Sequence, residues 1–144
     1  MDSFAQIRLS MFPQPINQPT EGKSAQPILL IIDDNVDINN ALTNVLQSRY
    51  RLITCLNYEE AKRSLIPEIK VVLLDIKMAG KDGIAVYQLL KRERPDLRIV
   101  FHSAYPGSSE KAAEIEHLRP SGYLTKGEYQ TPELFSVIDA ALNQ

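Results

Sequence analysis

Three features are scarce in this chain of 144 residues: cysteine, long apolar runs and an excess of charge of either sign. The single cysteine, Cys55, excludes a disulfide within the chain and suits a reducing compartment. No apolar run approaches the roughly 18 residues of a membrane span, and the N-terminus lacks the pattern of a secretion signal. The net charge of −2, with acids and bases interspersed, gives no sign of a nucleic-acid or membrane surface. We therefore expect a cytoplasmic protein.

Residues 1–26 differ in composition from the rest of the chain. Pro13, Pro15 and Pro19 interrupt any helix or strand there, and polar residues fill most of the intervals. This composition predicts a mobile extension, and the apolar residues within it leave open an arm that docks on this domain or on a partner. The folded domain is expected to cover residues 27–144, a length that fits one domain.

From Pro27 onward, short apolar runs alternate with segments of helical periodicity. The runs that predict strands are Ile28–Ile32, Arg51–Leu56, Val71–Leu74, Arg98–Phe101 and Gly122–Thr125. A helical pattern follows each run, and Thr131 is predicted to be the N-cap of the last helix, with Pro132 in its first turn. Because parallel strands need right-handed crossover connections, five strands alternating with five helices predict a doubly wound α/β sandwich with a parallel sheet.

In such a sandwich, ligands bind beyond the carboxyl ends of the strands. The residues that follow the predicted strands are Asp33 and Asp34 after the first, Asp75 after the third, Ser103 after the fourth and Lys126 after the fifth. Three carboxylates at one edge raise one another's pKa values and repel, and Lys126 supplies only one positive charge. The arrangement therefore predicts a divalent cation with oxygen ligands, for which Mg²⁺ is favoured.

A carboxylate, a metal, a lysine and a hydroxyl around one point suit phosphoryl transfer. The carboxylate attacks, the metal and the ammonium neutralise developing negative charge, and the hydroxyl donates a hydrogen bond. Each residue alone also has a structural interpretation, and Asp34 could serve only as a helix N-cap.

The same residues, in this order and at these spacings, resemble the response-regulator receiver family over about residues 27–143. The matching segments are Asp33-Asp34, Asp75-Ile76-Lys77-Met78 with Asp82-Gly83, Ser103-Ala104 and Gly122-Tyr123-Leu124-Thr125-Lys126. The resemblance implies a flavodoxin-like fold: a five-stranded parallel sheet of order 2-1-3-4-5 within a three-layer α/β/α sandwich of five flanking helices.

The resemblance also implies a role for each acidic residue. It makes Asp75 the nucleophile that accepts the phosphoryl group. It implies that Mg²⁺ is bound directly by Asp34, Asp75 and the backbone carbonyl of Lys77, and by Asp33 through a water.

On the opposite wall, the resemblance implies that Lys126 pairs with the phosphoryl group, whose oxygens bind Ser103 and the backbone N–H of Ala104. Tyr123 matches the family's aromatic switch residue, which turns inward when Ser103 is drawn to the phosphoryl group. Core packing is the alternative interpretation of Tyr123. Lys77 and Tyr105 match positions that flank the path of attacking water, which predicts slow self-dephosphorylation.

Two positions depart from the family pattern. Ala79 stands where the loop after the nucleophile carries proline, which costs rigidity but no chemistry. Gly127 stands where a proline forms a cis peptide with the preceding lysine. A cis bond to a residue other than proline costs about 3–4 kcal/mol, so the Lys126–Gly127 bond could be trans. We expect function to survive because the ammonium sits on a flexible stem.

The implied partner is a histidine kinase or a histidine phosphotransfer protein. The family commonly uses the face formed by the fourth helix, fifth strand and fifth helix for dimerisation or for docking an effector, here residues 109–118, 122–125 and 131–142. No binding of nucleic acid or membrane is expected of this domain.

Two other functions stay open. A Mg²⁺-dependent phosphatase with an aspartate nucleophile also uses an α/β sheet, but its acids alternate after the first strand, whereas Asp33 and Asp34 are adjacent. A receiver-like binding module that never accepts phosphate is the other alternative; the complete acid set argues against it, and Gly127 leaves it open.

Overall fold

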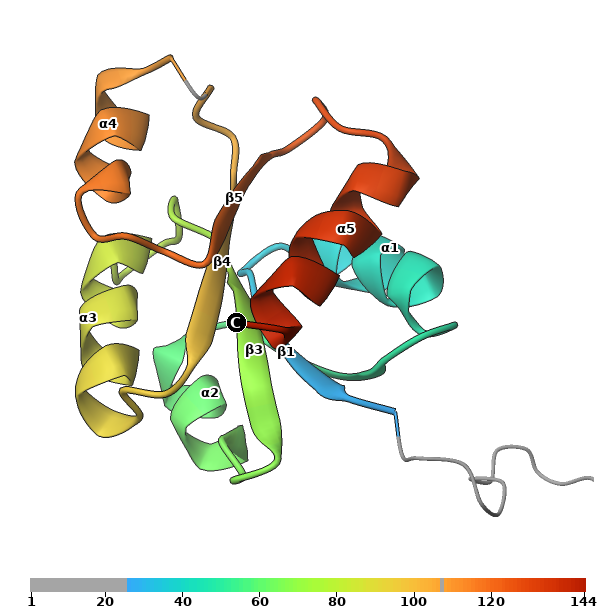
Figure 1. The fold of residues 1–144 in the computed structure, drawn as a ribbon. Coiled ribbons are helices and arrows are strands. Elements are labelled where there is room, and N and C mark those ends of the chain that lie inside the picture. The colour runs from blue at the N-terminus through green and yellow to red at the C-terminus, as the bar shows by residue number, and fades with distance from the viewer. Residues whose placement is uncertain (1–25, 107) are drawn as a thin grey trace, which may run out of the picture.

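The computed structural model describes residues 26–106 and 108–144, which alternate strand and helix along the chain (Figure 1). The predicted extension over residues 1–26 lies, apart from Gln26, outside the described residues. The elements are β1 (Ile28–Ile32), α1 (Val36–Leu46), β2 (Arg51–Cys55), α2 (Tyr58–Ser64), β3 (Ile69–Leu74), α3 (Gly83–Glu93), β4 (Arg98–Ser103), α4 (Glu110–Glu116), β5 (Gly122–Thr125) and α5 (Thr131–Leu142). Among them, no helix combines the length and apolar character that crossing a bilayer requires.

The sheet has five strands in the order β2-β1-β3-β4-β5, and every neighbouring pair is parallel. Helices α1 and α5 cover one face of the sheet, and α2, α3 and α4 cover the other (Figure 1). The predicted fold, a doubly wound three-layer sandwich with strand order 2-1-3-4-5, is confirmed.

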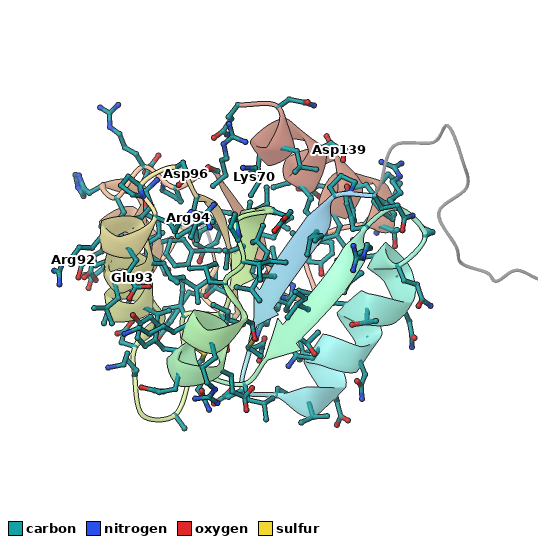
Figure 2. All side chains as sticks on the ribbon, turned by 90° about the horizontal axis from the view of Figure 1, so that it is seen from below. Lys70, Arg92, Glu93, Arg94, Asp96 and Asp139 are labelled. Carbon is teal, nitrogen blue, oxygen red and sulfur yellow. The ribbon has the colours of Figure 1, made fainter. Side chains whose placement is uncertain are left out.

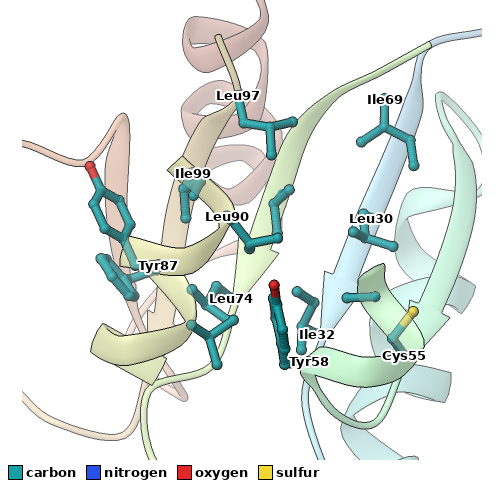
Figure 3. Close-up of a cluster of buried hydrophobic side chains, with 14 of the residues drawn as sticks. Leu30, Ile32, Cys55, Tyr58, Ile69, Leu74, Tyr87, Leu90, Leu97 and Ile99 are labelled. Carbon is teal, nitrogen blue, oxygen red and sulfur yellow. The ribbon is translucent and has the colours of Figure 1, made fainter. Parts of the chain in front are cut away.

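The central strands explain why the sheet is covered on both faces. All five residues of β1 are buried: Leu29 and Ile31 pack toward α1 and α5, whereas Leu30 and Ile32 pack toward α2 and α3. Figure 3 shows Leu30 and Ile32 in the apolar cluster on the side of α2 and α3, together with Tyr58 of α2. Burying an aliphatic side chain of this size contributes about 1.5–3 kcal/mol, so these two apolar layers are the main source of stability.

The start of α5 differs from the prediction. Gln130, not Thr131, occupies the N-cap position, with extended backbone and no side-chain capping bond, and Thr131 is already helical. The reason lies in the main chain, because the N–H groups of Glu133 and Leu134 both donate to the Gln130 carbonyl oxygen, at 3.0 and 3.2 Å. The first turn therefore closes one residue earlier than the threonine suggested, with Pro132 inside it as expected.

The amino ends of β3 and β4 are joined by Arg94, at the edge opposite the carboxyl ends. Its guanidinium donates to the carbonyl of Ile69 at 3.0 Å and pairs with Asp96 at 3.0 Å. Hydrogen bonding to Arg94 lowers the pKa of Asp96 to about 2. Figure 2 looks onto this edge and shows Arg94, Asp96 and Lys70 close together. This edge therefore carries structural ion pairs.

The first residue of α3 lies against the chain that follows β3. The N–H of Gly83 donates to the Ile76 carbonyl at 2.8 Å. A Cβ at Gly83 would lie 2.3 Å from the Asp75 carbonyl oxygen and 2.4 Å from the Ile76 Cα. Both are backbone atoms, so neither can rotate away, and glycine is required for this close approach.

We predict that Gly83→Ala lowers the free energy of unfolding by about 1–3 kcal/mol, because the added methyl group forces the backbone at Asp75 to shift. Urea unfolding of both proteins measures the difference. Gly80→Asn is the matched control, because Gly80 has a φ of +89° that asparagine tolerates, and its Cβ would meet nothing within 4 Å. Equal stability of the Gly83→Ala and unmodified proteins would contradict the prediction.

Candidate functional site

Three carboxylates meet at the carboxyl ends of β1 and β3. In the parallel register Ile32 lies beside Leu74, so Asp33 and Asp75, which follow them, are also side by side. The Asp75 N–H donates to the Ile32 carbonyl at 2.9 Å, which holds the two strand ends together. One oxygen from each of Asp33, Asp34 and Asp75 lies within 4.8 Å of the others.

Asp33 is buried, and two hydrogen bonds fix its position. Its Oδ1 accepts a hydrogen bond from the Asn35 N–H at 2.9 Å, and its backbone carbonyl accepts one from the buried Asn39 side chain at 2.9 Å. Asn35 is the N-cap of α1, since its side chain accepts from the N–H groups of Asp37 and Ile38. The alternative interpretation of Asp34 as only a helix N-cap is therefore wrong.

Asp34 is exposed and turns toward the loop after β3. Its Oδ2 accepts a hydrogen bond from the backbone N–H of Ala79 at 2.8 Å. A proline at this position has no N–H to donate. The departure from the family pattern at Ala79 thus adds a donor for the acid pocket, and sequence reasoning missed this contact.

Lys126 reaches two of the three acids. Its Nζ lies 2.9 Å from Asp33 Oδ2 and 3.1 Å from Asp75 Oδ1. The Lys126 N–H donates to the Ser103 carbonyl at 2.7 Å, which anchors the end of β5 to the end of β4. The described residues contain no cis peptide bond, so the Lys126–Gly127 bond is trans, and Gly127 adopts a φ of +79°.

The pKa values reflect this crowding of charge. Burial, and then the charge of Asp33, raise the pKa of Asp75 to about 6, although Lys126 opposes the shift. Burial alone would lower the pKa of Lys126, but its ion pairs with Asp33 and Asp75 outweigh the effect of burial and raise that pKa. Two buried carboxylates, Asp33 and Asp75, face the single ammonium of Lys126, so the site carries a net negative charge.

The donor set fits a hard divalent cation. Asp33 Oδ2 and Asp75 Oδ1 are buried, and although both lie at ion-pair distance from Lys126, neither receives a well-aligned hydrogen bond within the described chain. Carboxylate oxygens from Asp33, Asp34 and Asp75, against one ammonium, are the ligand type that Mg²⁺ prefers. Lys77, whose carbonyl was predicted to complete the set, is an exposed residue two positions after Asp75.

Ser103 and Tyr123 both bind the main chain of Tyr105. Ser103 is fully buried, and its Oγ accepts from the Tyr105 N–H at 3.0 Å. The Tyr123 hydroxyl donates to the Tyr105 carbonyl at 2.7 Å, and its ring packs against the core under α2, α3 and α4. Ser103 and Tyr123, the two residues predicted to form the switch, are thus linked through the main chain of Tyr105. Ala104, which follows Ser103, is exposed.

His102 is buried and lines a groove between α1 and α5, on the same face of the sheet as Lys126. Its Nε2 lies 2.9 Å from the hydroxyl of Tyr129, a loop residue that sequence reasoning did not single out. No pattern in the sequence marks this pair, because the two residues are 27 positions apart and one lies in an irregular segment.

Comparison with known proteins gives a consistent result. The family model described as response regulator receiver domain matches residues 29–139. The chain is 28% identical to the transcriptional regulatory protein TdiR of Thauera aromatica over 129 residues, 87% of this chain and 55% of that protein. It is 23% identical to the transcriptional regulatory protein CssR of Bacillus subtilis over 99 residues, 68% of this chain and 44% of CssR. The chain thus spans about half the length of these curated relatives.

A similar solved structure is that of the response regulator protein TrrA from Thermotoga maritima in complex with Mg²⁺ and beryllofluoride. It is 26% identical, with a TM-score of 0.70 over 81% of this chain and 99% of that one. The beryllofluoride-activated receiver domain of DrrB has a TM-score of 0.72 at 19% identity, over 83% of this chain and 99% of that one, a likeness of fold.

We predict that Asp75→Asn raises the free energy of unfolding at pH 7 in the presence of EDTA, by up to about 3 kcal/mol at 1.4 kcal/mol per pKa unit. The folded-state pKa of about 6 lies above the ordinary value of 3.8, so the folded state disfavours the carboxylate. The resulting penalty is absent below pH 4, grows between pH 4 and 6, and is complete above that.

Denaturant unfolding across this pH range measures the effect. The same exchange at exposed Asp37, in the first turn of α1, is the control, because it removes a favourable charge from a helix N-terminus and should lower stability slightly. A stability gain of Asp75→Asn that does not vary between pH 4 and 7 would show that the carboxylate is not penalised.

Proposed function

The chain belongs to the response regulator receiver domain family, and on that premise we propose that Asp75 accepts a phosphoryl group from a partner phosphohistidine in a Mg²⁺-dependent reaction. Its phosphorylation would then switch a protein-interaction surface. The observation that carries this proposal is the convergence of Asp33, Asp34, Asp75 and Lys126 at the carboxyl ends of β1, β3 and β5. The receiver unit is proposed to span residues 27–144.

The proposed reaction follows from the chemistry of these groups. At neutral pH the Asp75 carboxyl, with a pKa of about 6, is mostly ionised and can attack phosphorus. The bond from phosphorus to the imidazole nitrogen of the partner breaks, and the imidazole leaves. Lys126 is close enough to Asp75 to pair with the transferred oxygens in place of the carboxylate.

We propose that Asp34, Asp75 and the Lys77 carbonyl bind Mg²⁺ directly and that Asp33 does so through a water. When bound, the ion supplies charge neutralisation for the phosphoryl oxygens. The hydrogen bond from the Ala79 N–H supports this assignment, because it orients the Asp34 carboxylate toward the same pocket.

The proposed switch runs from Ser103 to Tyr123. Ser103 Oγ already accepts from the Tyr105 N–H, so its own proton is free to donate to a phosphoryl oxygen. The N–H of Ala104 is the second proposed donor. Drawing Ser103 toward the phosphoryl group would pull on Tyr105 and, through its carbonyl, on the Tyr123 hydroxyl. The bistable element is then the loop after β4.

The surface that this switch would change lies between α4 and β5. Tyr123 lines a cavity of about 700 Å³ there, together with Ala112, Ile115, Glu116, Arg119, Pro120 and Gly122. We propose that the face of α4, β5 and α5 serves a second copy of the chain or an effector. A histidine kinase or histidine phosphotransfer protein is the proposed phosphoryl donor.

We predict that incubation with acetyl phosphate and Mg²⁺ adds one phosphate-sized increment to the intact mass, and that Asp75→Asn abolishes it. Lys126→Ala should slow the modification at least about tenfold, because an ammonium that stabilises the transferred oxygens is lost. Asp96→Asn, at the opposite edge, is the control and should react at the unmodified rate. After the donor is removed, the increment should decay slowly, since Lys77 and Tyr105 flank the proposed path of water.

Three outcomes of this experiment separate the candidate functions. A stable increment that requires Asp75 supports the receiver. Continuous turnover of acetyl phosphate would instead identify a phosphatase, and absence of both incorporation and turnover would leave a binding module.

We predict that Ala79→Pro weakens Mg²⁺ binding about tenfold, because it removes the N–H that orients the Asp34 carboxylate. Isothermal titration calorimetry with MgCl₂ measures the affinity. Ala79→Gly is the matched control: it also changes the side chain but keeps the N–H, so its affinity should stay close to that of the unmodified protein. Equal Mg²⁺ affinities of the proline and glycine variants would show that the Ala79 N–H does not contribute to Mg²⁺ binding.

A further inference from the structure

The buried imidazole of His102 takes no part in the reaction proposed above. It lies at the end of β4, next to Ser103, with 4% of its surface exposed. Its Nε2 is 2.9 Å from the Tyr129 hydroxyl, and the two rings pack edge to face with centroids 5.7 Å apart. Tyr129 belongs to the loop that leads from Lys126 to α5.

Burying the His102 imidazole costs free energy, which the hydrogen bond to Tyr129 offsets only in part. The other ring nitrogen, Nδ1, is buried and has no hydrogen-bond partner within the described chain. Burial, and then the charge of Lys126, lower the pKa of His102 to about 4, so the ring is neutral at pH 7. An apolar side chain would avoid the cost of the unsatisfied nitrogen. The bond to Tyr129 is therefore the specific contribution that histidine makes here.

The loop that Tyr129 tethers is weakly held at its start. Gly127 adopts a φ of +79°, a conformation that glycine reaches without strain, and a Cβ there would meet nothing within 4 Å. Neither a proline ring nor close packing thus fixes the chain directly after Lys126. The hydrogen bonds that hold this turn are the Lys126 N–H to the Ser103 carbonyl, the Glu128 N–H to the Thr125 carbonyl, and the Tyr129 hydroxyl to His102, while the Tyr129 ring packs against the apolar core.

We propose that the His102–Tyr129 hydrogen bond is a positioning contact for Lys126, which fixes the turn after β5 so that the ammonium stays between Asp33 and Asp75. The pair lies on the same face of the sheet as Lys126, since His102, Tyr129 and Lys126 all line one groove between α1 and α5. Tyr129 and His102 are positioning residues and do not touch the reacting atoms. The inference rests on the proposed role of Lys126 in phosphoryl transfer.

The test is Tyr129→Phe, which removes the hydroxyl and keeps the ring. The rate of phosphorylation by acetyl phosphate should fall about 2- to 10-fold, the range expected for one lost hydrogen bond. Tyr50→Phe is the matched control: it removes a tyrosine hydroxyl bonded to Asp139 of α5, away from the acid site, and should leave the rate unchanged.

A double-mutant cycle distinguishes positioning from a general structural effect. If Tyr129 acts through Lys126, then Tyr129→Phe causes no further loss of rate in a Lys126→Ala background. An equal loss in both backgrounds would overturn the proposal, as would an unchanged rate for Tyr129→Phe alone.

Beryllofluoride binding, followed by ¹⁹F NMR, supplies a second readout if the Lys126→Ala rate is too low to measure. The affinity of the protein for beryllofluoride should fall by a similar factor in Tyr129→Phe. In a Lys126→Ala background, Tyr129→Phe should cause no further loss of affinity. If the unmodified protein neither takes up phosphate nor binds beryllofluoride, the proposed function fails and this inference fails with it. If the unmodified protein does both and Tyr129→Phe behaves identically, this inference alone fails.

Discussion

The ion pairs between Lys126 and the two buried acids, Asp33 and Asp75, are the constraint on which the rest of the structure depends. They bring one positive and two negative charges into a place with little solvent, and burying charge in this way is seldom a net source of stability. The apolar layers on both faces of the sheet must offset that cost. The close packing of Gly83 against the Asp75 carbonyl fixes the start of α3 against the chain that carries Asp75.

The sequence predicts most of this arrangement because two simple patterns coincide. Apolar runs mark the parallel strands, and the polar residue that ends each run marks the edge where the strands finish. The parallel register then brings Asp33 beside Asp75 without further information. Main-chain geometry in the loops is less predictable: the early closure of α5 on Gln130 and the hydrogen bond from Ala79 to Asp34 depend on N–H groups whose directions no side-chain pattern encodes. The Tyr129–His102 contact escaped prediction because it joins an irregular segment to a strand.

The end of β4 contacts both helix layers of the sandwich, the layer of α2, α3 and α4 and the layer of α1 and α5. Neighbouring residues of a strand point to opposite faces, so Ser103 and His102 face different helix layers. Ser103 leads through Tyr105 to Tyr123 and the cavity beside α4. His102 leads through Tyr129 to the turn that carries Lys126 and to the groove between α1 and α5. A short stretch of one strand therefore connects the proposed reacting site, the proposed output surface and the proposed support of Lys126.

The two hydrogen bonds at Tyr105 use its N–H and its carbonyl, and neither involves its ring. Every residue except proline carries both groups, so the link between Ser103 and Tyr123 places almost no demand on which side chain occupies this position. Under the proposed function, a different side chain at 105 would change how long the phosphoryl group persists and would leave this main-chain link intact. The proposed timing and the proposed transmission would then be separable properties of a single residue.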